Sequence, residues 1–183
     1  MDDFRLVTDR LILREWREED VDPFMAALDS DAVMRWLGGR QPRDHYVEVQ
    51  RRRAQEQAEH GHSFWIMERR SDGAIMGFCG IRRGQHAGTP IYGLPELGWR
   101  LRADEWGRGY AKEAALAAMA WWRNDMPDDD RVIAYTVPGN AASWGLMIAL
   151  GMTRRVEMDF DHPAFPVGHP LCRHIVYGVD RAA

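Results

Sequence analysis

The residues best suited to chemistry lie in two adjacent stretches, residues 96–101 and 106–111. In the first stretch Leu97, Trp99 and Leu101 alternate with Glu96, Gly98 and Arg100, the period of a strand with two different faces. A glycine-rich loop follows and opens a helix. Backbone N–H groups at a helix start lack intrahelical partners, and the helix dipole adds partial positive charge there. The glycines would let a phosphate approach the backbone, so the loop is a candidate pyrophosphate cradle.

The residues of the loop exclude two common kinds of phosphate-binding motif but do not identify the ligand. A dinucleotide-binding fingerprint needs a third glycine where Lys112 stands, and a P-loop needs Gly-Lys-Ser or Gly-Lys-Thr, which the sequence lacks. Gly107 and Gly109 taken alone are equally compatible with a tight turn that enters a helix. The loop therefore predicts either a phosphate site or a simple turn.

The elements that would position this loop follow from hydrophobic period, capping residues and glycine stops. Strands are expected near residues 11–13, 63–69, 74–83, 96–101, 132–137, 153–160 and 172–179. Helices are expected at 21–28, around 33–37, from Pro42 to Gly61, at 109–123, and from Asn140 to Gly151. The order predicts an α/β fold with a central mixed β-sheet flanked by helices, in a single domain over residues 1–183.

One family matches this combination of motifs. The run Trp106-Gly107-Arg108-Gly109-Tyr110-Ala111, with Glu113 and Ala114 after it, resembles the acetyl-CoA pyrophosphate loop of the GNAT N-acetyltransferases. It is most similar to the branch with the RimJ and RimL ribosomal-protein acetyltransferases. That loop usually reads Gln/Arg-x-x-Gly-x-Gly/Ala. Trp106 takes its first position here, while Gly109 and Ala111 match.

Further matches follow in the right order along nearly the whole chain. Residues 8–14 resemble the opening strand of the branch, 76–80 its Ile-Gly-x-x-Gly strand, and 96–99 the strand before the loop. Asn140 and Ser143 resemble the Asn-x-x-Ser start of a later helix. The chain departs from the branch after Ser143, where Trp144 replaces a frequent basic residue. Contacts to the nucleotide end of the cofactor are thereby put in doubt.

The resemblance implies a GNAT-like fold and direct transfer of an acetyl group from acetyl-CoA, as co-substrate, to a primary amine. It implies that the pantetheine arm lies between two strands, near residues 99–101 and 134–137. The cofactor-binding residues that it implies are Trp99, Leu101, Trp106, Gly107, Arg108, Gly109, Tyr110, Ala111, Asn140 and Ser143.

Two residues are candidates for proton transfer. Glu96 would take a proton from the amine, directly or through water; the alternative is a solvated strand carboxylate. An α-amine has a pKa near 8 against about 10.4 for lysine, so one carboxylate serves an α-amine more easily. Ser143 would donate to the departing thiolate, although Asn140 and Ser143 also suit a helix N-cap. Tyr135 and Tyr177 are alternative acids or core rings.

Composition excludes several other classes. The chain has 24 Lys and Arg against 28 Asp and Glu, a net charge of −4, which disfavours nucleic acid and anionic membranes as partners. No signal peptide or membrane helix is predicted, and Cys79 and Cys172 fit free buried thiols. The histidines, His60 and His62 among them, show no zinc spacing, so no metal is expected. We therefore expect a cytoplasmic protein.

The amine acceptor stays open between a protein or peptide N-terminus and a small molecule. The loops at residues 86–90 and 160–170 are expected to border the acceptor site because of their Gly, Pro and His content. A monomer or a homodimer is expected. The rival interpretations are a non-catalytic acetyl-CoA sensor or interaction module, and a binding module for another nucleotide.

Overall fold

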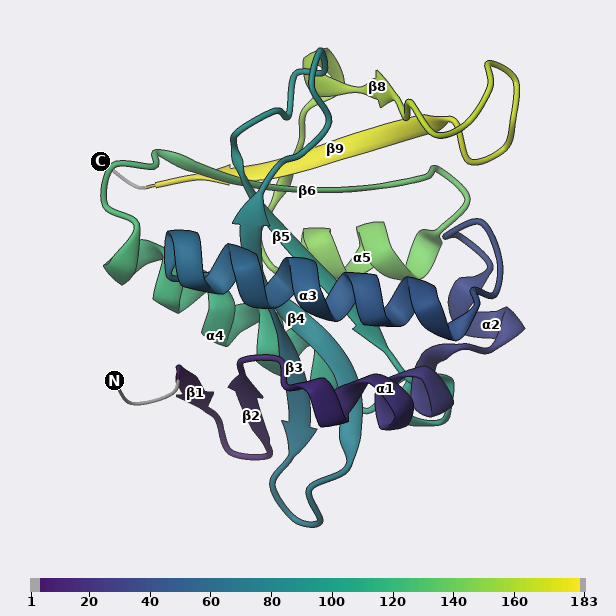
Figure 1. Cartoon of the computed structure of the whole chain (residues 1–183). Coiled ribbons are helices and arrows are strands. Elements are labelled where there is room, and N and C mark those ends of the chain that lie inside the picture. The colour runs from purple at the N-terminus through teal and green to yellow at the C-terminus, as the bar shows by residue number, and fades with distance from the viewer. Residues whose placement is uncertain (1–3, 182–183) are drawn as a thin grey trace. The chain divides into compact units, whose positions relative to one another are not determined.

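The computed structural model describes residues 4–181 (Figure 1). Contacts within the chain define two compact units, which we treat separately. The first unit comprises Met1–Arg82 with Gly98–Ala118, and the second comprises Arg83–Leu97 with Met119–Ala183. The single domain over residues 1–183 stays a prediction.

A mixed sheet of nine strands runs in the order β1-β2-β3-β4-β5-β6-β9-β7, with β8 paired to β9. The pairing of β5 with β6 is parallel, and the pairs β1–β2, β2–β3, β3–β4, β6–β9, β7–β9 and β8–β9 are antiparallel. The predicted mixed α/β fold with flanking helices is confirmed. The strands are β1 (Arg5–Val7), β2 (Leu11–Arg14), β3 (Phe64–Arg69), β4 (Ile75–Arg83), β5 (Pro95–Leu101), β6 (Arg131–Thr136), β7 (Thr153–Arg154), β8 (Phe160–Asp161) and β9 (Arg173–Asp180).

The helices confirm the expected positions to within a few residues. Gly61 ends α3 in the left-handed conformation, with φ of 73°, as a glycine after a helix does. The Ser30 side chain accepts from the Val33 N–H at 3.4 Å and so caps α2. The α-helices are α1 (Val21–Leu28), α2 (Asp31–Met34), α3 (Arg43–His60), α4 (Tyr110–Asp125) and α5 (Ala141–Ala149). Short 3-10 helices are η1 (Glu18–Asp20), η2 (Ala103–Glu105) and η3 (Val156–Met158).

The first unit packs α1, α2 and α3 around an apolar cluster that includes Phe24, Leu28, Met34, Tyr46 and Ile66. Each of these side chains is almost completely buried. Burial of large apolar and aromatic groups supplies the main driving force for folding such a unit. The cluster fixes the helices of the first unit to β3.

A buried charge group lies beside this cluster. Arg14 on β2 donates to both oxygens of Asp20, at 2.7 and 2.8 Å, and to Glu68 at 2.8 Å. Asp20 stands at the N-cap position of α1. Its carboxylate makes no cap bond to α1, however, because it binds Arg14 and accepts from the Arg17 N–H at 2.7 Å.

The second unit contains the antiparallel pair β6–β9 and a cluster formed by Ile91, Ile133, Met158, Phe160 and Val176. The single strand predicted for residues 153–160 is wrong, because η3 separates β7 from β8.

The side chain of Asp159 explains this break. Its carboxylate accepts from the Val176 N–H at 3.1 Å and pairs with Arg154 at 2.5 Å. Backbone groups of β9 are thereby satisfied by a side chain rather than by a continuous strand. The short strand β1 was not predicted from the sequence.

Candidate functional site

The loop that the sequence singled out joins η2 to the start of α4 in the first unit. Gly107 and Gly109 both have positive φ, 75° and 82°, which glycine adopts without the strain of a side chain. The backbone bond from the Glu113 N–H to the Gly109 oxygen, 3.0 Å long, closes the first turn of α4. The N–H groups of Tyr110 and Ala111 therefore lie at the helix start, where no carbonyl of the helix can accept them.

The space around the two glycines fits a phosphate group. A Cβ on Gly107 would meet nothing within 4 Å, and one on Gly109 would meet only the Arg10 Nη2 at 3.5 Å. The loop is therefore open on the side where the glycines lie, and Arg108 is exposed beside them. Exposed amides, a helix start and a cation together suit an anionic ligand.

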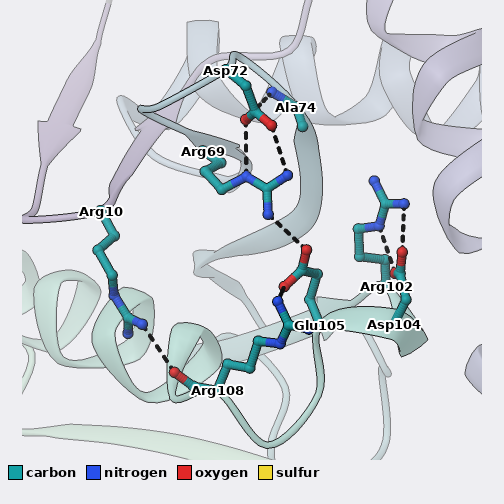
Figure 2. A network of polar contacts seen from close by, with 8 residues as sticks. All are labelled: Arg10, Arg69, Asp72, Ala74, Arg102, Asp104, Glu105 and Arg108. Carbon is teal, nitrogen blue, oxygen red and sulfur yellow. Dashed lines mark hydrogen bonds and ion pairs between the residues drawn. The ribbon is translucent and has the colours of Figure 1, made fainter.

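An ion-pair network fixes the loop from one side (Figure 2). Glu105 of η2, 7 % exposed, binds Arg69 of β3 at 2.6 Å and Arg108 of the loop at 3.0 Å. Arg69 also binds Asp72 through two hydrogen bonds of 2.9 and 2.7 Å. The hydrogen bonds that Arg69 donates to Asp72 and Glu105 raise the pKa of Arg69 well above its usual value. The carboxylate of Glu105 thus connects the loop to the β3–β4 turn.

A second set of contacts fixes the loop to the β1–β2 turn. Arg10 binds Glu113 of α4 at 2.6 Å and donates to the Arg108 carbonyl at 3.0 Å. Its guanidinium lies over the Tyr110 ring, 4.3 Å from the centroid. Burial alone would raise the pKa of Glu113, but hydrogen bonds from Thr8 and Arg10 outweigh it and lower that pKa. No local sequence pattern indicates these partners of the loop, because they are distant in the chain.

The strand before the loop presents two backbone amides away from β4. The Arg102 N–H donates to the Met76 oxygen of β4 at 2.9 Å. Because successive residues of a strand direct their backbone groups to opposite edges, the N–H groups of Trp99 and Leu101 face away from β4. The Leu101 carbonyl, on that same edge, accepts from the Trp106 indole at 2.9 Å. Trp106 is 51 % exposed. Because the Leu101 side chain is buried, its backbone groups are the part of this residue that can bind a ligand.

Glu96, the candidate base, lies in the second unit. It stands on β5 opposite Ile133 of β6, in the parallel register of those strands. The residue is 5 % exposed, so the alternative of a solvated strand carboxylate is wrong. The Glu96 side chain therefore has restricted access to solvent.

Asn140 and Ser143 form the N-cap that the sequence predicted. The Asn140 Oδ1 accepts from the Ser143 N–H at 3.4 Å, and its Nδ2 donates to the Thr136 hydroxyl at 3.1 Å. Thr136 ends β6, so this bond connects the strand to the start of α5. The Trp144 indole donates to the Pro138 carbonyl at 3.1 Å, which holds the turn between them. The Ser143 side chain is half-buried, and its contact with a cofactor stays a prediction.

The two loops expected beside the acceptor contact each other in the second unit. His86 of the first loop lies 4.3 Å from His162 and 5.9 Å from Phe160, between ring centroids. Tyr135 of β6 lies 5.2 Å from Phe160, and its hydroxyl is 3.2 Å from the His86 Nε2. His174 of β9 stacks on Phe160 at 5.4 Å. We call these five residues the ring cluster. Tyr135, one alternative acid, is thus half-buried among rings.

Burial makes one member of the ring cluster a weak base. His174 is 8 % exposed, and its pKa lies below the ordinary value because burial penalises the charged ring. The backbone carbonyl of Cys172 opposes this shift, and the nearby His162 adds to it. The neutral form of His174 is therefore favoured.

The remaining features concern metal binding, membrane spans, the cysteines and the core. Within residues 4–181, no group of three or more His, Cys, Asp or Glu side chains is placed to hold a metal ion. In the same part of the chain, no helix is both long enough and apolar enough to span a bilayer. Cys79 and Cys172 are buried free thiols. Trp122 is completely buried, as expected of a core ring.

Comparison with known proteins places the chain in a family. Residues 10–153 match the acetyltransferase (GNAT) domain, and the chain belongs to the GNAT acetyltransferase family. The uncharacterized protein YkkB of Bacillus subtilis is 30% identical over 149 residues, 81% of this chain and 84% of that protein.

Solved structures share the fold. An acetyltransferase from Agrobacterium tumefaciens is 25% identical, with a TM-score of 0.76 over 99% of this chain and 96% of that chain. The ribosomal-protein-S5-alanine acetyltransferase from Vibrio fischeri is 14% identical, with a TM-score of 0.71 over 97% of each chain. Ribosomal-protein acetyltransferases, RimL among them, are therefore structural neighbours of this protein.

Proposed function

We propose that this protein is an N-acetyltransferase that transfers the acetyl group of acetyl-CoA to a primary amine. The observation that carries the proposal is the open loop of two left-handed glycines at the start of α4. This geometry suits a pyrophosphate, and it occurs in a chain of the GNAT acetyltransferase family.

The residues of the loop take specific parts in binding the cofactor. The amides near Gly107, Gly109, Tyr110 and Ala111 donate hydrogen bonds to the pyrophosphate oxygens, and the exposed Arg108 adds positive charge. The Trp99 and Leu101 amides, facing away from β4, hydrogen-bond to the pantetheine arm and the thioester oxygen. Trp106 covers the loop with its exposed ring. Asn140 and Ser143 contact the arm of the cofactor.

Glu96 acts as the base that accepts the proton of the attacking amine, directly or through water. Its position on β5, the strand that leads into the glycine-rich loop, supports this role. Glu96→Gln should lower kcat at pH 7 by about two orders of magnitude, the usual contribution of one general base. The loss should shrink at high pH, where the amine is already neutral. Unchanged turnover at saturating amine would remove Glu96 from the mechanism.

Ser143 acts as the acid that donates a proton to the departing thiolate. Its half-buried side chain stands at the first turn of α5, where its backbone N–H is already bound by Asn140. Ser143→Ala should slow turnover about tenfold or more, with little change in the Kd for acetyl-CoA. A matched control is Ala142→Ser on the exposed side of the same turn. Equal rates for Ser143→Ala and the wild type would exclude this role.

The acceptor is a protein N-terminus or a small-molecule amine. Ribosomal-protein acetyltransferases among the structural neighbours favour an α-amine, as does the pKa near 8 of such groups. The net charge of −4 suits a cationic amine. We assign the protein to the cytoplasm because its two cysteines are free and buried. It acts as a monomer or a homodimer.

Thiol release from acetyl-CoA in the presence of peptides, amino acids, polyamines and aminoglycosides tests the proposal. We expect release with at least one class of amine and none without amine. Tight acetyl-CoA binding with no release across the panel would indicate a non-catalytic sensor. Binding of ATP or NAD without binding of CoA would overturn the proposal.

A further inference from the structure

Arg100 on β5 has an unusual environment for an arginine. Its Nη1 donates to the sulfur of Met34 at 3.6 Å, and its guanidinium lies 5.3 Å from the centroid of the Phe78 ring. A thioether is a weak acceptor, and a guanidinium has five N–H groups to satisfy. Within the part of the chain that the structure describes, no carboxylate forms an ion pair with Arg100.

Other arginines of the first unit differ from Arg100 in this respect. Arg14, Arg69 and Arg102 each bind a carboxylate through two hydrogen bonds of 2.9 Å or less. Arg102 lies two residues from Arg100 and pairs with Asp104 on the next element. These three arginines each bind a carboxylate, whereas Arg100 contacts a ring and a sulfur.

The carboxylate of Asp29 acts on Arg100 from a distance, but it is already bound to other residues. Asp29 accepts from the Tyr46 hydroxyl and the Gln41 N–H, both at 3.0 Å, and pairs with Arg40. Burial raises the pKa of Tyr46 to about 12, so its hydroxyl is neutral at ordinary pH. Arg53, on the neighbouring α3, adds further positive charge near Arg100.

The Arg100 charge therefore persists without a balancing group. Burial lowers the pKa of Arg100 to about 10, which still leaves the side chain charged at pH 7. Its residue is half-buried, so it keeps some access to solvent. Phe78 stacks on Phe64 at 5.1 Å, which gives the guanidinium an apolar floor. Electrostatic attraction is stronger over such a surface than in open water.

We infer that Arg100 binds the carboxylate of the acceptor, so that the preferred acceptor is an amine that also carries a carboxylate. A guanidinium fork matches a carboxylate with two parallel hydrogen bonds. One unbalanced charge suits one carboxylate better than a phosphate monoester, which carries nearly two. By strand alternation Arg100 is on the same side of β5 as Gly98. The acceptor class is then amino acids or peptides with an acidic group near the amine.

This inference rests on the proposed function. Pairs of acceptors that differ only in carboxylate or carboxamide test the inference separately from that function. The experiment compares kcat/KM for α-amino acids and acidic peptides with that for the same compounds as carboxamides. We expect the carboxylates to be at least tenfold better substrates of the wild-type protein, mainly through a lower acceptor KM. Thiol release at equal kcat/KM for acid and amide would overturn the inference alone. Release with no amine at all would overturn both proposals.

Variants of Arg100 test whether its guanidinium causes the preference for carboxylate acceptors. Arg100→Leu should bring the acid-to-amide ratio close to one, with the KM for acetyl-CoA unchanged, and Arg100→Lys should restore part of the ratio. Arg43→Leu, which removes an exposed arginine paired with Asp22, is the matched control and should keep the wild-type ratio. An unchanged ratio in Arg100→Leu would overturn the inference.

A binding measurement covers the case in which Arg100→Leu folds poorly. Saturating carboxylate acceptor should raise the Tm of the wild-type protein and of Arg43→Leu, whereas the carboxamide should not. The gain should be reduced in Arg100→Lys, which keeps the charge but loses the fork. Equal Tm gains from acid and amide in the wild type would contradict a carboxylate site.

Discussion

The loop before α4 and the ring cluster are held by different forces. In the first unit the loop is fixed by guanidinium groups, with Glu105 between Arg69 and Arg108. In the second unit the two expected acceptor loops are held by contacts between rings, such as the edge contact of His86 with His162. The first arrangement depends on opposite charges and the second on aromatic contact and burial.

This difference determines which solution variable each region senses. Arginine keeps its charge throughout the neutral range, and hydrogen bonds lower the pKa of Glu113, the carboxylate that binds Arg10. Histidine titrates near neutrality, and burial lowers the pKa of His174 further. The loop region should therefore respond to loss of a charge but little to pH. The ring cluster should respond to acid.

The largest effect should come from removing the carboxylate at the centre of the loop network. Glu105→Ala leaves Arg69 and Arg108 without their shared partner, one of them in a partly buried place. Hydrogen bonds to charged groups contribute about 1.5–3 kcal/mol, so we expect a loss of about 2 kcal/mol of unfolding free energy. The loop should also bind acetyl-CoA about tenfold more weakly. Urea denaturation and calorimetric titration measure the two effects.

Asp104→Ala is the control within the same 3-10 helix. Asp104 is 62% exposed in its side chain and pairs with Arg102 alone among the described carboxylate–arginine pairs. Exposed pairs contribute little, so the loss should stay under about 0.5 kcal/mol. Similar losses in both variants would show that the network does not depend on the buried carboxylate.

Local sequence patterns predicted much of the loop and its helix. The left-handed glycines, the start of α4 and the Asn140 cap follow from residue types that favour those conformations, and the structure has them. The mixed sheet also follows from element order and from the family resemblance.

Contacts between residues that are distant in the sequence could not be predicted from such local patterns. Arg10 and Glu113 bind each other across 103 positions, and no local pattern pairs them. Arg53 of α3 pairs with Glu56 and lies over the Phe64 ring, which belongs to another element, β3. The break at Asp159 depends on a bond to Val176, whose place opposite it is set by the fold. Tertiary hydrogen bonds override local strand propensity at that position.

A smaller effect should appear on acidification of the ring cluster. The folded-state pKa of His174 lies below that of the unfolded chain, so the unfolded state binds more protons between those two values. Unfolding free energy should then fall as the pH drops below about 6.5, by at most about 1.4 kcal/mol per pH unit for this one group. His174→Phe should flatten this dependence while keeping the stack on Phe160.

The measurement is urea denaturation of both proteins at a series of pH values from 8 to 5. Glu105→Ala serves as the comparison, since it should lower stability by a similar amount at each pH. If the His174→Phe protein and the wild type lost stability in parallel, the acid response would not come from His174.

The smallest effect should come from an ion pair at the edge of the ring cluster. Asp161 of β8 pairs with Arg173 of β9 at 3.3 Å, and both side chains are more than half exposed. If stacking rather than charge holds this region, Asp161→Asn should change the unfolding free energy by no more than about 0.3 kcal/mol. The change should vanish in high salt, and the acid response should persist because the rings remain. A loss above about 1 kcal/mol would mean that ion pairs support both regions, and the contrast between them would not hold.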